Sequence, residues 1–170
     1  MLFLPAIVAL VQAEEPPEED PLELAALLIG DGFWDRAQGV LDSVEEPDDP
    51  VRFHTLQGTV YLHDEAWPEA ADQLEAAIDL GGQDPTLWMR LSYAQQHYDL
   101  PAAYETVLGA PEYRGQQKQL ALILCELGLY QEALELDIGD DLEARRVIAE
   151  AMHRGGQTER AIDMLEQARL

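Results

Sequence analysis

One short pattern occurs five times along the sequence, and this repetition constrains the fold more than any other feature. Each copy has a helix with a small residue, a break, and a second helix with an alanine near its start. The alanines of the second helices are spaced 33, 33, 30 and 28 residues apart, at Ala37, Ala70, Ala103, Ala133 and Ala161. The spacing of the small residues in the first helices changes in the same way, with these residues at Ala25, Gly58, Ser92, Ala121 and Ala149. Two markers that shift together indicate a tandem array of helix hairpins.

Small residues at these positions allow two helices to approach closely, and larger apolar residues fill the remaining space. We expect Leu41, Leu74 and Leu165 to be such fillers in the second helices. Gly32, Gly128 and Gly156 lie in the breaks, where a positive φ is easily accommodated. No run of strand-like alternation competes, so the sequence predicts an all-α chain.

These residues resemble the tetratricopeptide repeat (TPR) family, whose helix-turn-helix unit has a period of about 34 residues. The resemblance covers residues 22–170 and implies a right-handed α-solenoid of about five antiparallel hairpins. The matching segments are Trp88-x2-Leu91-Ser92, Gly58-x2-Tyr61, Ala70-x3-Leu74 and Ala161-x3-Leu165. Two features depart from the family pattern. The last two copies are shorter, and Asp137 stands where an apolar residue belongs.

The resemblance implies that the first helices line an inner surface that holds a segment of another protein. Transferring the family's inner-surface positions gives these candidate partner-binding residues: Arg52, Thr55, Thr59, His63, Met89, Tyr93, His97, Lys118, Arg146, His153 and Arg154. They are neutral to basic, which suggests a partner segment of acidic or polar character. Alternatively, the basic residues only relieve repulsion between helices. The carboxylate clamp of chaperone-binding members needs paired Asn, and this sequence has no Asn.

The charge of the chain excludes some partners. There are 34 acidic and 10 basic residues, a formal net charge of −24. Nucleic acids and anionic membrane surfaces would be repelled at long range. A protein partner therefore remains the expectation.

The N-terminus has the character of an export signal. Residues 1–13 are uncharged and almost wholly apolar, and the run is too short for a transmembrane anchor. We expect a signal peptide cleaved after Ala13 and a secreted or periplasmic protein. The segment lacks Lys and Arg, so a hydrophobic strap packed on the first helix of a cytoplasmic protein is the alternative. The acidic, proline-rich stretch 14–21 is typical of a linker.

Catalysis and metal binding have little support in the sequence. His63 and His97 occupy equivalent repeat positions, but two ligands do not make a metal site. Cys125 lies in an apolar stretch, so we interpret it as a small hydrophobic residue of the core. The acids between Asp137 and Glu143 lack the pattern of a calcium loop. We therefore expect no cofactor and no enzyme activity.

The sequence thus predicts a non-catalytic adaptor that binds another protein. Two alternatives from other classes remain open. One is an accessory helical subunit of an envelope enzyme complex, and the other is a structural element that assembles with itself.

Overall fold

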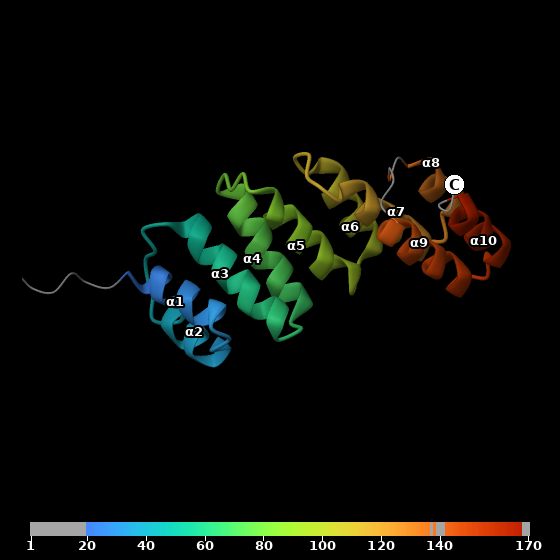
Figure 1. Ribbon diagram of the computed structural model, residues 1–170. Coiled ribbons are helices and arrows are strands. Elements are labelled where there is room, and N and C mark those ends of the chain that lie inside the picture. The colour runs from blue at the N-terminus through green and yellow to red at the C-terminus, as the bar shows by residue number, and fades with distance from the viewer. Residues whose placement is uncertain (1–19, 137, 139–141, 168–170) are drawn as a thin grey trace, which may run out of the picture.

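The computed structural model describes residues 20–136, 138 and 142–167 (Figure 1). Within them the chain forms ten helices and no strand. The helices are α1 (Pro21–Gly30), α2 (Trp34–Leu41), α3 (Pro50–His63), α4 (Trp67–Asp79), α5 (Pro85–Gln96), α6 (Leu100–Gly109), α7 (Gln116–Glu126), α8 (Tyr130–Glu135), α9 (Leu142–Arg154) and α10 (Thr158–Gln167). The predicted signal peptide, most of the predicted linker and Asp137 lie outside the described residues.

The helices pair into five hairpins that follow one another in a row from α1 to α10 (Figure 1). Each odd-numbered helix packs against the even-numbered helix that follows it. The second helices α2, α4 and α6 also contact the first helix of the next hairpin, whereas α9 packs against α7 of the hairpin before it. This arrangement confirms the predicted all-α solenoid, in which each unit buries its faces only against its neighbours.

Asp-Pro pairs define where three of the first helices begin. Pro21, Pro50 and Pro85 are the first residues of α1, α3 and α5, where a missing N–H costs nothing. The aspartate before each proline caps the helix. For example, Asp20 Oδ1 accepts a hydrogen bond of 2.9 Å from the Leu22 N–H. The first helix therefore starts at Pro21, inside the stretch that the sequence alone assigned to the linker.

The small residues lie where the helices of each hairpin meet. All five aligned alanines and all five aligned small residues are buried. At Gly58 the fit is close, since an added Cβ would lie 2.8 Å from Leu74 Cγ. Leu41 and Leu74 are fully buried fillers, as predicted. Burying a leucine side chain of this kind contributes about 1.5–3 kcal/mol.

The fifth hairpin differs from the prediction in one filler. Leu165 is 40% exposed, while Met164 is 8% exposed and joins the core with Ala161. A shift of one residue along a helix rotates the side chain by about 100°. The aligned alanines Ala161 and Ala70 are buried in both helices, so α10 differs from α4 only in which residue is the filler.

The breaks within the hairpins have the expected backbone. Gly32, Gly128 and Gly156 have φ angles of 78°, 78° and 81°. In the second hairpin the equivalent turn position is Glu65, with φ of 58°. A non-glycine residue in this left-handed region costs about 1–2 kcal/mol.

Candidate protein-interaction face

The predicted partner-binding residues all belong to first helices or their ends. The structure places Arg52, Thr55, Thr59 and His63 on α3, Met89 and Tyr93 on α5, His97 at the end of α5, Lys118 on α7, and Arg146, His153 and Arg154 on α9. We call the surface made by α1, α3, α5, α7 and α9 the first-helix face. Side-chain contacts between consecutive first helices show how this face is held together.

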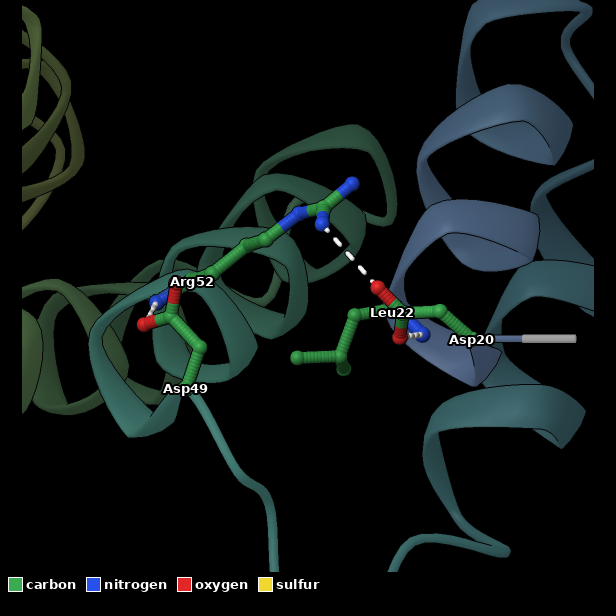
Figure 2. A network of polar contacts seen from close by, with 4 residues as sticks. All are labelled: Asp20, Leu22, Asp49 and Arg52. Atoms are coloured by element: carbon green, nitrogen blue, oxygen red, sulfur yellow. Dashed lines mark hydrogen bonds and ion pairs between the residues drawn. The ribbon is translucent and has the colours of Figure 1, made fainter. Parts of the chain in front are cut away.

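The first contact joins α3 to α1 (Figure 2). Arg52 Nη1 lies 3.3 Å from Asp20 Oδ2 and donates a hydrogen bond to it. The other carboxylate oxygen of Asp20 caps α1 at Leu22, and Asp49 caps α3 at the Arg52 N–H. Both side chains of the pair are about half exposed, so the pair contributes at most about 1 kcal/mol. The charge of Arg52 nevertheless already faces a carboxylate.

The second contact joins α5 to α3. Arg90 Nη1 donates a hydrogen bond of 2.8 Å to Thr59 Oγ1. The Thr59 hydroxyl in turn donates to the Thr55 carbonyl at 2.7 Å, and the Thr55 hydroxyl donates to the Val51 carbonyl at 2.7 Å. Both threonine protons are therefore used within α3. The Thr59 oxygen can therefore only accept a further hydrogen bond, and the bond that it accepts from Arg90 holds the guanidinium in place.

The third contact joins α7 to α5. Gln119 Nε2 donates to Ser92 Oγ and lies 3.5 Å from the Met89 carbonyl oxygen. The amide oxygen of Gln119 accepts a hydrogen bond of 2.6 Å from the hydroxyl of Tyr113. Burial raises the pKa of Tyr113 above its ordinary value. The segment of α7 around Lys118 thus lies beside the middle of α5.

Arg90 and Gln119 were absent from the residues predicted for this face. Each stands two residues before the aligned small residue of its helix, Ser92 and Ala121 respectively. Their side chains reach back by about one repeat, across 31 residues for Arg90 and Thr59 and 27 for Gln119 and Ser92. That shared register is the signal by which the sequence could have revealed them.

Two of the predicted histidines stack on tryptophans at one edge of the face. The rings of His63 and Trp34 are 4.1 Å apart and those of His97 and Trp67 are 3.7 Å apart, both nearly parallel. Tyr93 meets the edges of the second pair, 5.8 Å from Trp67 and 5.2 Å from His97. Each tryptophan starts a second helix and covers the end of the next first helix.

The remaining predicted residues are solvent-accessible. Met89 is 41% exposed and Tyr93 is 50% exposed. Lys118 is half-buried on α7. On α9, Arg146 Nη1 lies 3.7 Å from Glu150 Oε2. The exposed apolar side chains of Met89 and Tyr93 on α5 therefore lie between helices that carry the cations Arg52, Lys118 and Arg146.

A surface recess of about 350 Å³ lies next to the stacked pair of Trp34 and His63. Arg36 covers the ring of Phe33 there, with its guanidinium carbon 5.4 Å from the ring centre. The remaining lining residues are Gly32, Asp35 and Asp64. This recess is formed by the turn between α1 and α2, the start of α2 and the end of α3. It lies away from the middle of the first-helix face.

Within the described part of the chain, no three His, Cys, Asp or Glu side chains are grouped so as to hold a metal ion. Cys125 is buried, and this burial, together with the nearby charge of Glu126, raises the pKa of its thiol to about 11. The thiol is thus a poor nucleophile at neutral pH. Among the described helices, none combines the length and apolar content needed to cross a membrane.

Solved structures provide the comparison for this fold. The chain is similar to the crystal structure of YrrB, a TPR protein with an unusual peptide-binding site, with a TM-score of 0.70 and 22% identity. That similarity covers 87% of this chain and 82% of YrrB. A crystal structure of MamA is also similar, with a TM-score of 0.70 and 18% identity over 85% of this chain and 92% of MamA.

A second MamA structure, from AMB-1, has a TM-score of 0.66 and 16% identity, covering 88% of each chain. No family model matches the sequence, and no curated protein matches it. At these identities the similarity describes the fold alone. The chain has the fold of a TPR-like helical repeat protein.

Proposed function

We propose that this chain is a non-catalytic scaffold that binds a segment of another protein along its first-helix face. One observation carries the proposal. Four consecutive first helices each present a cationic side chain, namely Arg52, Arg90, Lys118 and Arg146, on a chain whose net charge is −24. A cationic row on an acidic protein attracts a partner segment of acidic or polar character and sets its register.

The construction of the face supports this function. The contacts of Arg52, Arg90 and Gln119 tie α1, α3, α5 and α7 together, so a bound segment meets a preformed surface. A preformed surface lowers the entropic cost of binding. The exposed side chains of Met89 and Tyr93 provide apolar contact area in its middle. YrrB, which has a similar fold, is a TPR protein with a peptide-binding site.

Variants of two tyrosines test the proposal, Tyr93 on α5 and Tyr98 in the turn between α5 and α6. Tyr93 lies on the first-helix face, 50% exposed. Tyr98 is similarly exposed, at 52%, but it follows the end of α5, and its pKa is raised by partial burial and by the charges of Glu75 and Asp72 on the second helix α4. The wild-type chain and each variant, Tyr93→Ser and Tyr98→Ser, are used as bait in a cell extract and the captured proteins are identified by mass spectrometry.

We expect the wild-type chain and Tyr98→Ser to recover the same partner and Tyr93→Ser to lose most of it. Circular dichroism checks that both variants keep the helical fold. Equal recovery by the two variants, or loss with Tyr98→Ser alone, would contradict binding on the first-helix face.

A further inference from the structure

We propose that the centre of the first-helix face is a carboxylate-recognition site formed by Arg90 and Lys118 around Met89 and Tyr93. Its ligand is an extended segment of another protein in which an Asp or Glu stands next to an apolar side chain. This inference rests on the proposed function, because it names the part of that face that selects the partner.

The outer cations of the row are already paired within the chain. Arg52 holds Asp20 at 3.3 Å and Arg146 holds Glu150 at 3.7 Å. Arg90 and Lys118 form no ion pair within residues 20–136, 138 and 142–167. Since a paired cation must first give up its carboxylate, an incoming carboxylate gains most at the two central residues.

Arg90 is held in place before any ligand arrives. One N–H of its guanidinium donates a hydrogen bond to Thr59 Oγ1. The Thr59 hydroxyl in turn donates its proton to the Thr55 carbonyl. A guanidinium has five N–H donors in a planar fork, so donors remain for a carboxylate. Arg90 also contributes a little to the lowered pKa of Asp84, which is due chiefly to hydrogen bonds from Thr86.

The repeat register places the other side chains around this guanidinium. Thr59, which Arg90 contacts, stands one residue after the small residue of α3, and Tyr93 stands at the same position of α5. Met89 lies one helical turn before Tyr93 and therefore on the same side of α5. Lys118 occupies in α7 the position that Met89 occupies in α5, three residues before the small residue.

Contacts between α5 and α7 bring Lys118 to the same place. Gln119, its neighbour in the chain, reaches Ser92 Oγ and lies 3.5 Å from the Met89 carbonyl oxygen. The apolar surface of Met89 and Tyr93 is thus bordered by a cation on α5 and another on α7. Methionine adapts to varied apolar side chains, which suits recognition of an aliphatic or aromatic neighbour.

The charge of the whole chain limits how acidic the ligand can be. With a net charge of −24, a long run of acids is repelled over most of the surface. A single carboxylate beside an apolar residue gains the hydrogen bonds at Arg90 without that repulsion. The predicted ligand is therefore a mixed acidic and apolar segment rather than a polyacidic one.

A phage-displayed library of random peptides, panned on the purified chain, tests this assignment. We expect the selected peptides to share an Asp or Glu next to an apolar residue. For a synthetic peptide from this selection, Arg90→Gln and Lys118→Gln should each weaken binding about tenfold, as measured by calorimetry. Arg36→Gln, which removes the same charge over Phe33, is the matched control and should leave binding unchanged.

A double-mutant cycle identifies the group that Arg90 recognises. Changing the acidic residue of the peptide to its amide should cost about tenfold with the wild-type chain and little with Arg90→Gln. Arg90→Lys, which keeps the charge but loses the planar fork, should retain part of the affinity. Circular dichroism of each variant separates loss of recognition from loss of fold.

The outcomes distinguish this inference from the proposed function. Peptides that depend on Tyr93 but lack an acidic residue, or whose affinity is unaffected by Arg90→Gln, overturn the carboxylate site alone. Peptides insensitive to both Tyr93→Ser and Arg90→Gln overturn the proposed function as well. A library that yields no binding peptide counts against both.

Discussion

The close approach of α3 and α4 at Gly58 can be tested by exchanging side-chain volume between two residues. An alanine Cβ at position 58 would lie 2.8 Å from Leu74 Cγ and 3.0 Å from Leu74 Cδ2. Both of those atoms are removed by Leu74→Ala. The two substitutions should therefore be strongly non-additive.

The expected magnitudes follow from this geometry. Leu74 is fully buried, so Leu74→Ala alone should lower the free energy of unfolding by about 2–5 kcal/mol. Gly58→Ala alone gains about 1 kcal/mol of helix propensity but loses about 1–3 kcal/mol to overpacking. In the Leu74→Ala background the overlap is gone, and Gly58→Ala should raise stability by about 1–2 kcal/mol.

Urea unfolding of the four proteins, followed by circular dichroism, measures the coupling. We expect an interaction energy of about 1–3 kcal/mol between positions 58 and 74. Gly39→Ala is a matched control, since the added Cβ meets no atom within 4 Å, and its effect should be the same in both backgrounds. An effect of Gly58→Ala that does not change with the residue at position 74 would refute the close-contact reasoning.

Three further predictions concern single positions. Glu65→Gly should raise the free energy of unfolding by about 1 kcal/mol in urea, because φ of 58° disfavours a side chain; an unchanged midpoint would contradict this. Asp84→Ala should cost about 1 kcal/mol by removing the cap of α5. The hydrogen bonds from Thr86 lower the pKa of Asp84, so this cost should be full at neutral pH, begin to decline below about 3.8, and vanish as the pH falls through the lower pKa of the folded chain, which unfolding at several pH values would show. The thiol of Cys125, with its pKa raised to about 11, should react with iodoacetamide at pH 8 far more slowly in the native chain than in urea; equal rates would argue against its burial.

Much of the fold could be predicted because its signals are local. The aligned alanines and small residues are buried where helices meet, and the glycines of three breaks have positive φ. Each of these signals depends on residues within one hairpin. The Asp-Pro caps are equally local, and recognising them would have placed the start of α1 at Pro21.

The candidate face was predicted less completely because its contacts are not local. Arg52 meets Asp20, and Arg90 meets Thr59, across 32 and 31 residues respectively. The distance between such side chains depends on how one hairpin is rotated against the next. Family positions pointed to the first helices but could not distinguish a paired cation such as Arg52 from one with no ion pair among the described residues, such as Lys118.

The sequence by itself determined the number of hairpins, their helical nature and the positions where helices touch, because spacing, small residues and turn residues act within about thirty residues. Only the tertiary structure decided which side chains of neighbouring repeats meet. It showed that Met164 rather than Leu165 enters the core of the last hairpin, that His63 and His97 stack on tryptophans, and that Arg90 is anchored on Thr59. The physical reason is that a helix surface is fixed by its own sequence, whereas the rotation between two hairpins results from packing all their side chains at once.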